Sequence, residues 1–174
     1  MGLALDQDMT GIGPTAVEAV RGRVLDRTAL AAIPADQWND LSRNALVENP
    51  FHDRAHVLAT LETVDKQKPV KALAYTTPSG TLIGLFLYQP RSKVPSPLPV
   101  ANGFHNDYLV NSLPLVHRAY GASVVDAFLR DIKSGAVPGL WSFPDIELTS
   151  PFMKLVDAGI AEHGLTITSV HPYE

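Results

Sequence analysis

The sequence of 174 residues contains no cysteine. This absence excludes disulfide bridges, metal sites built on thiolates and thiol nucleophiles. A run of lysine and arginine is also missing: 14 basic residues stand against 18 acidic ones, which gives a formal net charge of −4. Nucleic acid is therefore not an expected partner.

Long apolar runs are absent as well. No stretch of about 18 uninterrupted apolar residues could span a membrane, and the start of the chain lacks the basic and apolar regions of a secretory signal. We therefore expect a cytoplasmic protein without a membrane span. Apolar residues make up 45% of the chain, enough at this length to bury one core. Residues 1–21 show weak periodicity and are predicted to be a loose leader, and residues 22–174 a single domain.

Hydrophobic periodicity predicts the order of the elements along the chain. The predicted strands are 23–25, 70–76, 81–89, 108–115, 140–146 and 165–170, and the predicted helices begin at Pro34 or cover 53–65, 123–133 and 150–163. A Thr-Pro-Ser-Gly turn joins the second and third strands as an antiparallel hairpin. Residues 90–99 contain four prolines, which lack the amide donor of a strand, and are predicted to be a surface loop.

A glycine-containing turn from Arg118 to Ser123 precedes the predicted helix 123–133. The start of a helix presents unpaired amides and a positive dipole end, which together favour an anion such as pyrophosphate. The alternative is a simple helix cap, in which the Ser123 hydroxyl accepts a hydrogen bond from the first turn. The spacing of these residues leaves both interpretations open.

Three segments resemble the GNAT acyltransferase superfamily. "GTLIGLFLY" resembles its second hairpin strand, "YLVNSLPLVHRAYGASVVDAFL" its fourth strand and acyl-CoA loop, and "SPFMKLVDAGIAEHGLTITSV" its last helix and strands. With "NPFHDRAHVLATLE", the chain is most similar to the N-terminal half of CelD-type proteins, a branch related to the FemAB transferases that usually carries two GNAT-like halves. The resemblance implies an α/β fold with a mixed, mostly antiparallel central sheet flanked by helices.

The resemblance also implies an activity, the transfer of an acyl group from acetyl-CoA or another acyl-CoA to a small-molecule or peptidyl amine. The cofactor-binding positions that it implies are Val116, Arg118, Gly121, Ala122 and Ser123. Ser123 departs from the glycine or alanine usual in the family. The alternative function is a non-catalytic GNAT-like module that binds or docks a partner, such as a second GNAT-like half or another copy in a homodimer.

Candidate catalytic residues cluster at the start of the predicted strand 108–115. They are His105, Asp107 and Tyr108, and either His105 or Asp107 could act as the general base that takes the proton of the amine. The family's usual acid, a tyrosine in the last helix, is missing, so this role would fall to Tyr120, Tyr173 or water. The same cluster is also typical of a loop whose side chains bond the nearby backbone.

One further pair of residues has the spacing of a metal site. His52 and His56 stand four residues apart, which would place both imidazoles on one helical face. No third ligand accompanies them in the sequence. We therefore interpret the pair as the solvated start of a helix and predict no metal site.

Overall fold

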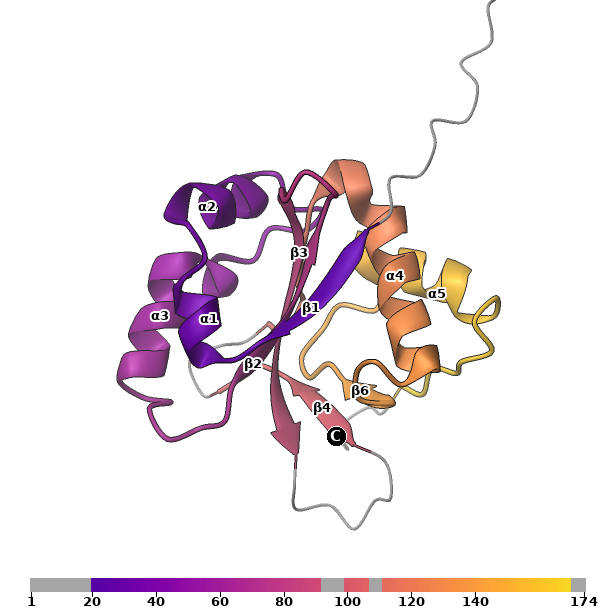
Figure 1. The fold of residues 1–174 in the computed structure, drawn as a ribbon. Helices are drawn as coiled ribbons and strands as arrows, with labels where there is room; N and C mark the ends of the chain where they lie inside the picture. The colour runs from indigo at the N-terminus through magenta and orange to yellow at the C-terminus, as the bar shows by residue number, and fades with distance from the viewer. Residues whose placement is uncertain (1–19, 92–98, 107–110, 170–174) are drawn as a thin grey trace, which may run out of the picture.

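The computed structural model describes residues 20–91, 99–106 and 111–169. Over these residues the chain is a mixed α/β structure, in which helices flank both faces of a six-stranded, mostly antiparallel sheet (Figure 1). The strands are β1 (Arg21–Leu25), β2 (Lys71–Thr76), β3 (Leu82–Arg91), β4 (Val100–Gly103), β5 (Leu115–Val116) and β6 (Leu140–Ser142). The helices are α1 (Arg27–Ala31), α2 (Ala35–Arg43), α3 (Arg54–Glu62), α4 (Gly121–Ser134) and α5 (Pro151–Ile160), with short 3-10 turns η1 (Pro50–His52) and η2 (Arg118–Tyr120).

The strand order is β1-β2-β3-β4-β6, with β1 and β6 at the two edges. All neighbours along this path are antiparallel except β4 and β6, which are parallel. The long strand β3 has two partners on the same side: β4 pairs with its end, and the two-residue β5 pairs with Gly84 and Leu85 near its start. Helix α4 connects β5 to β6, which is the crossover that a parallel pair requires.

Alternation along the strands divides the apolar residues between two cores. Ala72 and Ala74 of β2 face the core beneath α1 to α3, whereas Leu73 and Tyr75 face the core beneath α4 and α5. Figure 1 shows these two groups of helices on opposite sides of the sheet. Aromatic rings fill the second core around Phe86, which contacts the rings of four neighbours: Tyr75, Phe128, Trp141 and Phe152.

The predicted hairpin is confirmed, since β2 and β3 pair from Lys71 opposite Tyr88 to Thr76 opposite Leu82. The amide of Gly80 donates to the Thr77 carbonyl at 2.9 Å and closes the turn. Gly80 has φ +90°, a conformation that glycine adopts without steric cost.

The predicted loop 90–99 is wrong at its start, because β3 continues through Pro90 and Arg91. Pro90 lies opposite Ala101 of β4. The pairing with β2 has already ended at Tyr88, so β3 has a strand on only one side here and tolerates a residue without an amide donor. Residues 92–98 lie outside the described part of the chain.

The predicted strand 108–115 is also largely wrong. Residues 108–110 lie outside the described part of the chain, residues 111–114 belong to no strand, and only Leu115 and Val116 pair with β3. The main partner of β3 on this side is the unpredicted β4, whose sequence "VANG" lacks alternation and contains two residues that disfavour strands.

The remaining differences are one additional helix, two elements that end early and one predicted strand that does not form. Helix α1 was not predicted, although the Asp26 carboxylate caps it by accepting a hydrogen bond from the Ala29 amide at 2.8 Å. Strand β6 ends at Ser142 rather than Ile146, and α5 ends at Ile160 rather than His163. Residues 165–169 form no strand, and Val170 lies outside the described residues.

Candidate functional site

The segment from β5 to the first turn of α4, residues 115–123, is the β5–α4 turn, and it contains all five implied cofactor positions. Val116 is buried, and its carbonyl accepts a hydrogen bond from the Leu46 amide at 2.7 Å. Ala45 forms an antiparallel bridge with His117 beside it. Residues 44–46, which follow α2, therefore lie along the edge of β5 that faces away from β3.

The backbone amides of the turn are bonded within the protein. Four consecutive amides donate hydrogen bonds: His117 to the Ile83 carbonyl (2.9 Å), Arg118 to the Asn44 carbonyl (2.9 Å), Ala119 to the His117 Nδ1 (3.1 Å) and Tyr120 to the His117 carbonyl (2.9 Å). A pyrophosphate site of this type needs successive amides that are free to donate. In this conformation the amides before α4 are not free.

The Arg118 side chain points to the end of α2. Its guanidinium donates to the Asn44 carbonyl at 3.3 Å and to the Arg43 carbonyl at 3.2 Å, while remaining exposed to solvent. A cation at the C-terminal end of a helix satisfies free carbonyls and opposes the negative end of the dipole. Arg118 thus fastens the β5–α4 turn to α2.

The three small residues at the start of α4 have different surroundings. Gly121 is buried, and a Cβ atom there would lie 3.0 Å from Cδ1 of Leu155 on α5. Ala122 is exposed and Ser123 is half-buried, and both lie inside the first turn, because the N-cap position belongs to Tyr120. The glycine therefore permits close packing of α4 on α5, and only the Ala122 side of the helix start is open to solvent.

Of the three catalytic candidates, the structure describes His105 only; Asp107 and Tyr108 lie outside the described residues. The His105 Nε2 lies 3.6 Å from an Asp145 carboxylate oxygen, and both side chains are substantially exposed. Asp145 has φ +53°, which aspartate tolerates better than most residues. The sequence reasoning missed Asp145, although the Pro-Asp pair in "FPDIE" is typical of a turn.

The prediction of a solvated helix start at His52 is wrong. His52 lies in η1, before α3 begins at Arg54, and its side chain is fully buried. Burial lowers its pKa to about 4, the nearby His56 lowers the pKa further, and the backbone of Phe104 opposes the change. Across the described segments, no group of three or more His, Asp or Glu side chains is arranged to hold a metal ion.

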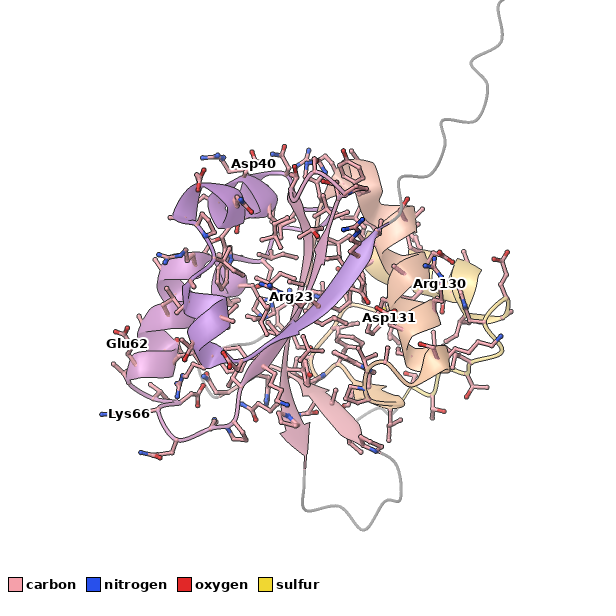
Figure 2. All side chains as sticks on the ribbon, in the orientation of Figure 1. Arg23, Asp40, Glu62, Lys66, Arg130 and Asp131 are labelled. Carbon is pink, nitrogen blue, oxygen red and sulfur yellow. The ribbon has the colours of Figure 1, made fainter. Side chains whose placement is uncertain are left out.

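A partly buried hydrogen bond joins the sheet to α4. The Tyr75 hydroxyl donates to the Asp131 carboxylate at 2.9 Å. Figure 2 shows Asp131 on α4, on the side that faces β1. Burial raises the pKa of Tyr75, and the negative charge of Asp131 raises it further. Tyr75 therefore stays protonated at neutral pH and donates to the carboxylate, which identifies it as a structural contact rather than a proton carrier.

Comparison with known families, curated proteins and solved structures finds no significant match. None of the helices in residues 20–91, 99–106 and 111–169 combines the length and apolar character needed to cross a bilayer.

Proposed function

We propose that this chain is a GNAT-like module that docks a partner protein and does not transfer acyl groups itself. One observation carries the proposal. Residues 44–46 occupy the outer edge of β5, and the four backbone amides that follow β5, those of residues 117–120, are hydrogen-bonded within the protein. An acyl-CoA that bound through these four amides would have to displace those bonds, whereas the amides of Gly121, Ala122 and Ser123 lie in the first turn of α4. The partner that best fits the resemblance is a second GNAT-like half.

Docking is also supported by the two edges of the sheet. Val24 on β1 is 42% exposed and Leu140 on β6 is 49% exposed, so each edge strand presents an apolar side chain to solvent. Strand edges with unpaired backbone groups are common sites of association. We consider such docking to take place in the cytoplasm.

The second candidate function is an acyl-CoA-dependent N-acyltransferase with a small-molecule or peptidyl amine as acceptor. The order of elements favours it, because an antiparallel run β1 to β4 followed by the α4 crossover to the parallel strand β6 matches the order expected for the family. The solvent-exposed Ala122 in the first turn of α4 leaves a place where a pyrophosphate could approach the helix dipole.

Calorimetric titration of the full chain with acetyl-CoA separates the two functions. The docking proposal predicts no heat of binding and no thermal shift. An acyltransferase would bind, and a hundredfold excess of ligand over its dissociation constant would stabilise the fold by about 2.7 kcal/mol.

Ala122, which is exposed in the first turn of α4, is the position for a variant that tests pyrophosphate binding. Ala122→Glu adds a negative charge that stabilises the helix by about 0.3–1 kcal/mol through its dipole but repels a pyrophosphate. Ala122→Gln is the neutral control of the same size. Acetyl-CoA binding that is weakened at least tenfold by Ala122→Glu and retained by Ala122→Gln would contradict the docking proposal.

A further inference from the structure

Strand β1 forms one edge of the sheet and pairs with β2 alone. Its other edge, which we call the β1 edge, therefore presents alternate backbone N–H and C=O groups without a strand partner in the described structure. Arg21 to Val24 are all exposed, and only Leu25 anchors the strand in the core. Such an edge is a template for a strand from another protein.

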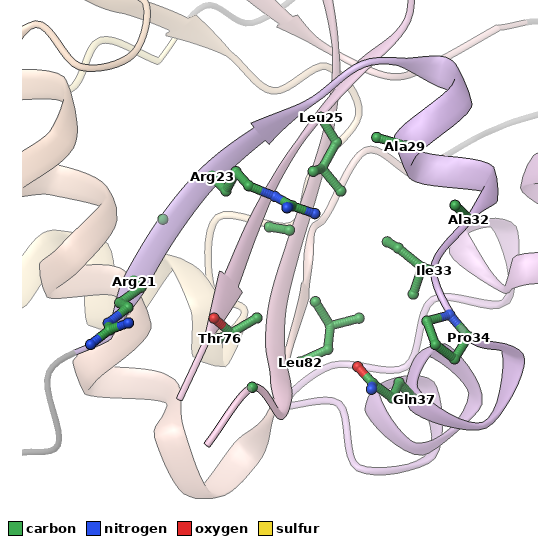
Figure 3. Close-up of a pocket in the computed structure, with 13 residues that line it drawn as sticks. Arg21, Arg23, Leu25, Ala29, Ala32, Ile33, Pro34, Gln37, Thr76 and Leu82 are labelled. Atoms are coloured by element: carbon green, nitrogen blue, oxygen red, sulfur yellow. The ribbon is translucent and has the colours of Figure 1, made fainter. Parts of the chain in front are cut away.

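A groove opens over the face of the sheet next to β1, between its first three strands and the helices α1 and α2 (Figure 3). Its volume is about 580 Å³. Its apolar walls include Leu25, Ala29, Ile33, Ala74 and Leu82. Polar residues also line it: Arg23 extends from β1 toward the helices, and Gln37 points inward from α2, as Figure 3 shows.

Arg21 and Arg23 bring positive charge to the face of β1 that carries Leu25, whereas the Asp131 carboxylate lies beside Gly22 on the opposite face. Neither Arg21 nor Arg23 makes a hydrogen bond or ion pair with a residue in the described segments. An unpaired guanidinium beside an apolar surface is suited to a carboxylate, which it binds through two parallel hydrogen bonds. The side chains of 21 and 23 alternate with the exposed Val24, which lies on the opposite face of the strand.

We propose that the β1 edge binds an extended acidic segment of a partner protein, which adds a strand to the sheet. In this segment acidic residues alternate with apolar ones: the acidic side chains face Arg21 and Arg23, and the apolar side chains face Val24. The inference deepens the proposed docking function, on which it rests, by naming the chemistry of the partner.

A second copy of this chain fits the β1 edge poorly. Antiparallel self-pairing centred on Arg23 would place this arginine opposite its own counterpart, and self-pairing centred on Gly22 would place Arg21 opposite Arg23. Like charges directly opposite each other destabilise a strand pair. The same charges that exclude self-pairing select an acidic strand.

The test uses the full chain and a fluorescent seven-residue peptide in which two glutamates alternate with three valines, measured by fluorescence anisotropy. Wild type should bind it, and a peptide with glutamine in place of glutamate should bind at least tenfold more weakly. Arg23→Glu should lose the glutamate peptide and bind instead a peptide in which only the glutamate that faces residue 23 is replaced by lysine. Lys154→Glu, an equal charge reversal on α5, should behave as wild type.

Backbone pairing is tested by methylating the peptide amides that would donate to β1, which should abolish binding while the charges stay in place. Thermal unfolding of each protein variant checks that it is folded, and Arg23 is exposed, so its replacement should leave the midpoint unchanged. The proposal is overturned by an absence of binding to wild type, by equal binding of the glutamine or methylated peptide, or by a concentration-dependent dimer that competes with the peptide. Heat released on titration with acetyl-CoA would contradict the proposed function, in which the chain does not transfer acyl groups. The peptide measurements would still test the β1 edge on their own.

Discussion

Acidification should destabilise this protein through one buried histidine. The His52 imidazole is fully buried, and neither ring nitrogen makes a hydrogen bond of normal geometry with a described residue. Burial therefore favours the neutral form, and the pKa falls from 6.5 to about 4 in the folded protein. The unfolded chain exposes the same imidazole to water, where it regains its ordinary affinity for a proton.

The direction of the effect follows from the number of protons bound in each state. Between pH 6.5 and about pH 4 the unfolded chain binds the proton and the folded protein does not, so the free energy of unfolding falls as the pH is lowered through this range. One pKa unit corresponds to about 1.4 kcal/mol, so His52 should remove about 2 kcal/mol at pH 5 and about 3 kcal/mol at pH 4. Above pH 6.5 its contribution is complete and constant.

The assay is urea unfolding at several pH values between 4.5 and 7.5, compared between wild type and His52→Gln. The variant lacks the titrating group, so its free energy of unfolding should fall less on acidification, by about 2 kcal/mol at pH 5. His105→Gln makes the same exchange at a partly exposed position and controls for the loss of an imidazole as such. Parallel curves for wild type and His52→Gln would refute the reasoning, whatever their absolute stabilities.

Three further predictions concern packing and hydrogen bonds and are measured by urea unfolding. Gly121→Val should cost about 1–3 kcal/mol, because its Cβ would press on Leu155 of α5, whereas Ala122→Val at the exposed neighbour should cost about 0.5 kcal/mol; equal costs would exclude the packing role. Tyr75→Phe should cost about 1–2 kcal/mol by removing the donor to Asp131, and should cost clearly less in an Asp131→Ala background, which lacks the acceptor; full additivity would argue against the contact. Ser150→Ala should cost about 0.5–2 kcal/mol, because its hydroxyl caps α5 at the Met153 amide, whereas Ser123→Ala, inside α4, should cost little; the reverse order would contradict the cap assignment.

Local patterns in the sequence were sufficient for the elements whose partners are close in the chain or whose apolar stripe is long. The β2–β3 hairpin carries its own turn, and the stripe of α4 places Val125, Phe128 and Leu129 in the core as predicted. Strand β4 could not be found in this way, because its four residues gain their stability from β3 on one side and β6 on the other. The expected last strand at 165–169 failed for the converse reason: its residues alternate, but no strand in the described structure pairs with them.

The candidate site was predictable in position but not in its bonding. The sequence places a turn and a helix start near Arg118, and the structure has both. The bonding partners could not be predicted, because they come from segments far away in the sequence. The Arg118 guanidinium bonds the end of α2, and the Leu46 amide bonds the Val116 carbonyl. The burial of His52 was not predictable for a similar reason, since a histidine next to Asp53 at the start of a helix is typical of the surface, and the core around it comes from distant segments.

The connectivity of the sheet has a consequence for the order in which the protein assembles. A tight turn joins β2 to β3, whereas β1 is separated from β2 by α1, α2 and α3, and β6 is separated from β4 by β5 and α4. Contacts between distant segments are slow to form, because the entropy of closing the loop must be lost before the contact is gained. The β2–β3 hairpin should therefore form early, and β1 and β6 should join it late and open first in the native state. Amide hydrogen exchange should accordingly be slowest in Leu73 and Phe86 and fastest in the two edge strands.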